Sequence, residues 1–152
     1  GKLRAFFSRT VSRDLFDVDQ LLNEGLDVTD TNTRLAFVLY GAMNPKDLRH
    51  VKIDDIKVSA QELKEKLLPV LRVKTVKELG SLDEFGKQIV TRCKDRLSTL
   101  LPLTDKEAEF IRLVRDEAKI EPALLTSDRN LQTIISEHPA LKWRVFQERN
   151  RQ

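Results

Sequence analysis

Four charged side chains gather within seven positions near the start of the sequence. Arg13, Asp14, Asp17 and Asp19 lie in the stretch KLRAFFSRTVSRDLFDVDQLL, residues 2–22. Asp14 and Asp17 are three positions apart and would share one face of a helix. Two carboxylates on one face can hold Mg²⁺ through their oxygens, or one of them can act as a base beside a phosphate. The stretch is therefore a candidate active site.

The same residues also suit the first turn of an ordinary helix. Ser12 can cap the helix, Asp14 would then lie where the helix dipole favours negative charge, and Arg13 can pair with Asp17 at i,i+4. Asp17 and Asp19 spell D-x-D, but residues two apart on a helix point in nearly opposite directions. We therefore expect Asp19 to face solvent, and the pattern alone leaves both interpretations of Asp14 open.

Basic residues occur near both ends of the sequence. The first thirteen positions contain Lys2, Arg4, Arg9 and Arg13. These cations can meet the phosphates of a nucleotide or of RNA, or they can be the solvated sides of helices. The tail KWRVFQERNR, residues 142–151, mixes bases with Trp143 and Phe146, a combination that can serve nucleic acid. The i,i+3 spacing of the two aromatic residues favours packing against a neighbouring helix instead.

The composition excludes several classes of site. One cysteine excludes an internal disulfide, and two histidines far apart argue against a histidine metal cluster. The net charge of +3, from 27 basic and 24 acidic residues, is compatible with an anionic ligand but is not polybasic. No apolar run is long enough for a membrane span and no signal peptide opens the chain, so we expect a cytoplasmic protein.

Apolar residues recur at helical spacing along nearly the whole chain. We therefore predict an all-α fold, an irregular bundle of about seven to nine helices with little or no sheet. Capping boxes are expected where a hydroxyl precedes a glutamate by three positions, at Ser59–Glu62, Ser81–Glu84 and Thr104–Glu107. Residues 47–58 are interpreted as a loop with a short helical turn. The chain can be one domain, 1–152, with a possible subdivision into 1–72 and 81–152.

Two stretches resemble one protein family. KLRAFF…SRDLFDVDQLL is similar to a segment of the AbiEii/AbiGii abortive-infection nucleotidyltransferase toxins, K-L-x-A-L…R-x-x-x-R-D-L-Y-D-L-x-x-L. LPLTDKEAEFIRLVRDEAKIEPALLTSDRNLQTIISEHPALKWRVFQERN, residues 101–150, is similar to that family's closing segment, with its LT-x-x-E-x-E-F-L, P-x-L-L-T-x-D and HP-x-L-x-W-K motifs. Together the two stretches cover about half of the chain.

The resemblance implies a division of roles among these residues. It implies that Lys2 reaches the nucleotide phosphates and that Asp14 lies near the reacting group. It also implies that Asp17 is a second active-site aspartate and that Arg13 is a structural or phosphate partner. In that family a sheet with a glycine turn and a metal-binding D-x-D precedes the lysine. We therefore expect this chain to correspond to the carboxy-terminal helical portion, inactive alone, with Mg²⁺ and NTP bound only when the amino-terminal core is present.

The candidate functions come from different classes. The first is transfer of NMP from an NTP to an RNA acceptor, often tRNA in relatives, or to a protein. Its candidate phosphate-binding residues are Lys2, Arg9 and Arg13, and its candidate acceptor-binding residues are Arg144 and Arg149. The alternative is a non-catalytic helical module that binds a partner protein such as an antitoxin. A simple RNA-binding domain is the weakest interpretation because the net charge is small.

Overall fold

The protein is all-α, as the sequence predicts. A computed structural model describes residues 3, 5–6, 12–71 and 73–151. Within these residues it contains eight α-helices, α2 to α9, and five short helical turns, η1 to η5, with no strand. The candidate residues Lys2 and Arg9 lie outside the described residues. Residues 47–58 form a loop with two 3₁₀ turns, which agrees with the prediction.

The chain divides into two compact units, and each unit is built from two separate segments. Unit 1 contains residues 1–29 and 52–102, and unit 2 contains residues 30–51 and 103–152. Both sides of the polar stretch near residues 72–81, where the sequence suggests a possible subdivision, belong to unit 1.

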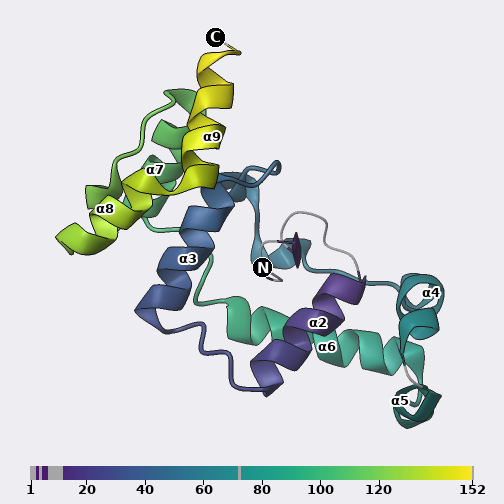
Figure 1. The fold of residues 1–152 in the computed structure, drawn as a ribbon. Coiled ribbons are helices and arrows are strands. Elements are labelled where there is room, and N and C mark those ends of the chain that lie inside the picture. Colours follow the sequence, from purple (N-terminus) through teal and green to yellow (C-terminus); the bar gives the residue numbers. More distant parts are fainter. Residues whose placement is uncertain (1–2, 4, 7–11, 72, 152) are drawn as a thin grey trace. The chain divides into compact units, whose positions relative to one another are not determined.

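Unit 1 is organised around the pairing of α2 with α6, which lie against each other (Figure 1). Its elements are α2 (Ser12–Asn23), η2 (Ile53–Asp55), α4 (Ala60–Glu62), the π-helical turn η3 (Leu63–Leu67), η4 (Leu68–Val70), α5 (Val73–Glu78) and α6 (Leu82–Leu97). The buried side chains recur at helical spacing: Leu15, Val18 and Leu22 on α2, Leu63 and Leu67 on η3, and Ile89, Cys93 and Leu97 on α6. A Cβ atom at Gly86 would lie 3.0 Å from Leu63 Cδ1, so a glycine lets α6 approach η3 closely.

Unit 2 is a cluster of four longer helices in which α3 and α9 both contact α7, and α8 contacts α9 (Figure 1). Its elements are α3 (Thr31–Ala42), η1 (Leu48–His50), α7 (Asp105–Asp116), η5 (Pro122–Leu124), α8 (Arg129–Glu137) and α9 (Pro139–Arg149). Phe110, Ile111 and Val114 of α7 and Leu141 and Val145 of α9 are buried in its core.

The aromatic residues of α9 do not pack as the sequence predicts. Trp143 and Phe146 are among the exposed large side chains, whereas Leu141 and Val145 are buried. The apolar residues of α9 thus lie on two different faces, and the aliphatic face enters the core. The expectation that Trp143 and Phe146 pack against a neighbouring helix is wrong for this structure.

The three predicted capping boxes form to different extents. At Thr104 the box is complete: the Glu107 N–H donates to Thr104 Oγ1 (3.3 Å), and the Thr104 N–H donates to Glu107 Oε2 (2.8 Å). At Ser59 the hydroxyl accepts from the Glu62 N–H (3.1 Å), while the Glu62 carboxylate is bound elsewhere. Ser81 makes no side-chain cap hydrogen bond.

This difference gives a stability prediction with a matched control. Thr104→Ala should lower the free energy of unfolding by about 1 kcal/mol, because the first turn of α7 loses a side-chain acceptor. Ser81→Ala removes a hydroxyl from the same position of α6 but no cap hydrogen bond, so we expect less than half of that loss. Urea unfolding followed by circular dichroism measures both variants, and equal losses would contradict the assignment of the box.

Among the described residues, none of the helices combines the length and the apolar character that a membrane span requires.

Candidate functional site

The start of α2 is tied to α4 by a contact between residues fifty positions apart. The backbone N–H of Ser12 donates to Glu62 Oε1 at 2.7 Å, and Ser12 Oγ donates to the Glu62 carbonyl oxygen at 3.5 Å. The first N–H groups of a helix have no partner within the helix, so an external carboxylate satisfies one of them and compensates the helix dipole. Glu62 therefore serves α2 rather than completing the box with Ser59, and it holds the amino end of α2 in place.

Asp14 is a buried carboxylate in the first turn of α2. The residue is only 6% exposed, whereas its neighbour Arg13 is exposed and Asp17, one turn later, is partly buried. A buried carboxylate needs compensation, and the positive end of the helix dipole supplies part of it. The structure thus places Asp14 and Asp17 together on α2, with the first of them held within unit 1 rather than on its surface.

The expectation that Asp19 faces solvent is wrong. Its side chain is only 3% exposed, and it accepts two hydrogen bonds from Arg92 of α6, from Nε to Oδ1 at 2.9 Å and from Nη2 to Oδ2 at 2.8 Å. Asn23 Nδ2 also donates to Asp19 Oδ2 at 3.3 Å. The face of α2 to which Asp19 turns is covered by α6.

The contact between α2 and α6 contains further polar groups. Arg96 Nη1 donates to the Leu22 carbonyl oxygen at 2.5 Å, which satisfies a carbonyl at the carboxyl end of α2. Cys93 is buried one turn before Arg96, and burial, together with the nearby charge of Asp19, raises the pKa of its thiol to about 12. Such a thiol stays protonated and is not a nucleophile at neutral pH. These contacts fix the orientation of α2 and hence the position of Asp14.

The two candidate acceptor-binding residues lie on α9 in unit 2. Arg144 is mostly buried and pairs with Glu148 one turn later (2.6 Å), and burial, with Arg115 nearby, lowers the pKa of its guanidinium. Arg149 is exposed, and its Nη2 donates to the Ala118 carbonyl oxygen at 3.4 Å. The role of either residue in binding an acceptor stays a prediction.

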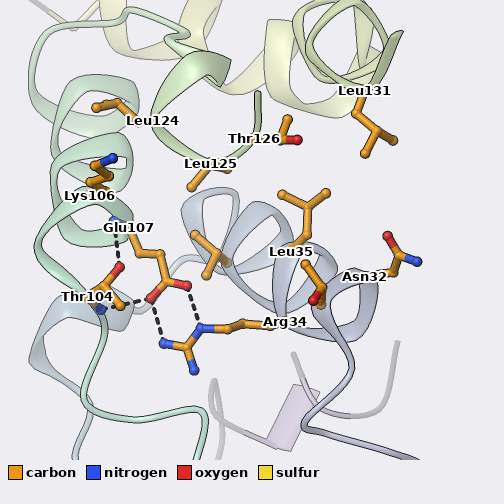
Figure 2. A pocket seen from close by; sticks show the side chains of 12 residues that line it. Asn32, Arg34, Leu35, Thr104, Lys106, Glu107, Leu124, Leu125, Thr126 and Leu131 are labelled. Carbon is orange, nitrogen blue, oxygen red and sulfur yellow. Dashed lines mark hydrogen bonds and ion pairs between the residues drawn. The ribbon is translucent and has the colours of Figure 1, made fainter. Parts of the chain in front are cut away.

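Unit 2 contains a small pocket between the amino ends of α3 and α7, η5 and α8 (Figure 2). An ion pair closes one edge: Arg34 donates to both carboxylate oxygens of Glu107, at 2.6 and 2.7 Å. Leu35, Leu124 and Leu131 supply apolar walls (Figure 2). The volume is about 170 Å³, below the roughly 300 Å³ at which small-molecule pockets usually begin. The pocket can hold a single side chain but not a nucleoside triphosphate.

The ion pair at this pocket gives a pH prediction. Burial would raise the pKa of the Glu107 carboxyl, but the hydrogen bonds from Arg34 and Thr104 outweigh burial and bring the pKa below its ordinary value of 4.5. A lowered pKa stabilises the fold above the unfolded pKa, and this contribution is lost as the pH falls through the folded value. The stability difference between the parent and Glu107→Gln should therefore be largest near neutral pH and shrink below pH 4.5, as measured by thermal unfolding. A difference that grows on acidification would contradict this.

Comparison with known proteins decides the family. The sequence matches the family described as "Nucleotidyl transferase AbiEii toxin, Type IV TA system" over residues 1–150. The chain belongs to the AbiEii family. The match covers nearly all of the 152 residues and confirms the resemblance seen in the two sequence stretches. Neither the curated proteins nor the solved structures gave a match.

The described part of this AbiEii chain does not form a metal centre by itself. Nowhere in it do three or more His, Cys, Asp or Glu side chains come together in a way that could hold a metal ion. Asp14 and Asp17 offer at most two carboxylates from one helix, and Asp19 is engaged by Arg92.

Sequence reasoning missed two features of the AbiEii chain that position α2. Glu62 was expected to serve only its own helix, and Arg92 gave no signal because 73 positions separate it from Asp19. Two signals could have indicated these contacts. Glu62 could serve either of two helix starts, and Asp19 of the D-x-D falls on an apolar face beside Val18 and Leu22.

Proposed function

We propose that this chain is the helical part of a nucleotidyltransferase toxin that transfers NMP from an NTP to an RNA or protein acceptor. Membership of the AbiEii family over residues 1–150 carries the proposal. The family is one of toxins of type IV toxin–antitoxin systems, so an antitoxin counteracts the protein. The alternative function is that of a non-catalytic interaction module, whose helical surface binds a partner protein such as the antitoxin directly.

Asp14 is the residue of this chain that we place nearest to the reacting group. Its burial in the first turn of α2 and the anchoring of that helix by Glu62 and Arg92 support this role, because a base must be held in a fixed position to take a proton from an acceptor hydroxyl. Asp17 is its secondary candidate on the same helix. Lys2, Arg9 and Arg13 are proposed to meet the phosphates of the nucleotide.

The nucleotide and its cation require ligands beyond the described residues. In nucleotidyl transfer a divalent cation reduces the negative charge of the triphosphate and orients the attack. The described residues provide no complete cation site, and the pocket of unit 2 is too small for the triphosphate. In this proposal the chain supplies the base, the phosphate-binding cations and a surface for the acceptor.

Labelled-nucleotide transfer tests the proposal. The full-length protein that contains this chain is incubated with Mg²⁺, each labelled NTP separately, and either a total-RNA pool or a protein pool. The expected result is label covalently attached to one acceptor class. No label should become attached when EDTA is present from the start of the reaction. No transfer to either pool, combined with a stable complex with the cognate antitoxin, would favour the interaction module instead.

A further inference from the structure

Helix α9 presents a stacked aromatic pair to solvent. The rings of Trp143 and Phe146 lie with their centroids 5.6 Å apart and their planes 23° from parallel. The two residues are 59% and 53% exposed, while Leu141 and Val145 of the same helix fill the core. The pair therefore lies outside the core of unit 2, and more than half of each residue is open to solvent.

Basic side chains outnumber acidic ones on this helix. Residues 139–151 contain four basic side chains and one acidic side chain. A modest total charge of +3 does not argue against an anionic partner where a local excess of basic residues lies beside an exposed aromatic pair.

The register of α9 places cations beside the rings. Lys142 precedes Phe146 by four positions and Arg149 follows it by three, so both lie on the Phe146 side of the helix, one turn before and one turn after that ring. Lys142 pairs with Glu137, but both side chains are largely exposed, and such a pair is weak enough to exchange for a phosphate. Arg144, in contrast, is mostly buried and its charge is balanced by Glu148.

We propose that this face of α9 binds a single-stranded polynucleotide, whose bases stack on Trp143 and Phe146 and whose phosphates meet Lys142 and Arg149. A single strand fits better than a duplex, because its bases offer their faces, whereas those in a duplex are already stacked. The positive charge beside the rings favours a polyanion over a neutral apolar protein surface. The identity of the strand as the acceptor rests on the proposed function, but the binding itself does not.

The only tryptophan of the chain is Trp143, which makes the proposal directly measurable. The chain is titrated with an unstructured RNA of about 12 nucleotides, within the usual site size for such surfaces, and with a duplex of the same length. Stacking should quench the fluorescence of Trp143 with the single strand and not with the duplex. Anisotropy of the labelled strand gives the affinity.

Three variants and a control separate the contributions. Phe146→Ala should weaken binding about fivefold to a hundredfold through the loss of base stacking. Lys142→Ala and Arg149→Ala should each lower the slope of log affinity against log salt concentration by about 0.7. Ile134→Ala removes a comparably exposed apolar residue, 61% exposed, from the neighbouring helix α8 and should change neither quantity. All four side chains are exposed, and circular dichroism checks that the variants fold.

Several outcomes would overturn the inference. They are an absence of quenching, equal quenching by strand and duplex, and binding that Phe146→Ala does not weaken. A blue shift of Trp143 that grows with protein concentration without RNA would show that a second copy of the chain covers the pair instead. Strand binding without nucleotidyl transfer would refute the proposed function and leave this inference standing. Transfer to RNA by the parent, together with unchanged strand binding by Phe146→Ala, would support the proposed function and refute this inference.

Discussion

Replacing Asp14 with asparagine should lower nucleotidyl transfer by about a hundredfold or more while leaving unit 1 folded. A positioned general base contributes on the order of 10² to 10⁴ to the rate, and asparagine keeps the shape of the side chain but cannot take the proton. Unit 1 should stay folded, because asparagine keeps the shape of the side chain and the change removes a buried charge. Transfer rates and thermal unfolding of the full-length protein measure the two effects.

Asp17→Asn is the matched control for this prediction. It makes the same chemical change one turn along α2, at a residue that is less buried. We expect a smaller loss of transfer than with Asp14→Asn, and equal losses would make the two carboxylates a functional pair. If Asp14→Asn transfers label at the parental rate, Asp14 is only the acidic residue of a helix's first turn, and the base lies elsewhere.

The helices could be predicted because their signals are local. Val18 and Leu22, or Leu63 and Leu67, lie one turn apart and mark the buried face of a helix before any neighbour is known. Pro139 begins α9, where its missing N–H costs nothing.

The packing of those helices against one another could not be predicted, because several apolar helix faces look alike in the sequence. Each unit joins two separate segments of the chain, and apolar faces of similar composition do not show which of them meet. On α9 the spacing of Trp143 and Phe146 favours packing of the aromatic residues, but Leu141 and Val145 occupy the core.

For the candidate site the same limit applies to charged residues. The types and spacing of Asp14, Asp17 and Asp19 define the possible chemistry but not their surroundings. The three residues differ in their burial. Asp14 is buried in the first turn of α2, Asp17 is partly exposed, and Asp19 is buried and pairs with Arg92 of α6. A charge pair 73 positions apart has no periodic signature, since either partner alone resembles an ordinary surface residue.

The anchor between Asp19 and Arg92 should be the most stabilising ion pair of unit 1. Removing one partner of a buried pair leaves an uncompensated charge and typically costs about 3 to 5 kcal/mol. The Asp19 side chain is 3% exposed and that of Arg92 is 41% exposed, so Arg92 can reach water but Asp19 cannot. We therefore expect Arg92→Ala to lower the free energy of unfolding by about 3 kcal/mol, at the lower end of the range because Asn23 still donates to Asp19.

The asymmetry between the partners makes this prediction specific. Asp19→Asn should cost less than Arg92→Ala, because it leaves the remaining charge on the side chain that water can solvate. Adding Asp19→Asn to Arg92→Ala should recover part of the loss, since the double variant has no buried charge without a partner.

Lys87→Ala provides the control on the same helix. Lys87 pairs with Asp83 at 2.6 Å, a distance as short as those of the anchor, but both side chains are highly exposed. An exposed ion pair is screened by water and contributes little, so this variant should change the free energy of unfolding little. Urea unfolding of both variants compares a buried and an exposed ion pair of α6. If Arg92→Ala costs no more than Lys87→Ala, α2 is held on α6 by apolar packing alone, and the position of Asp14 does not depend on the anchor.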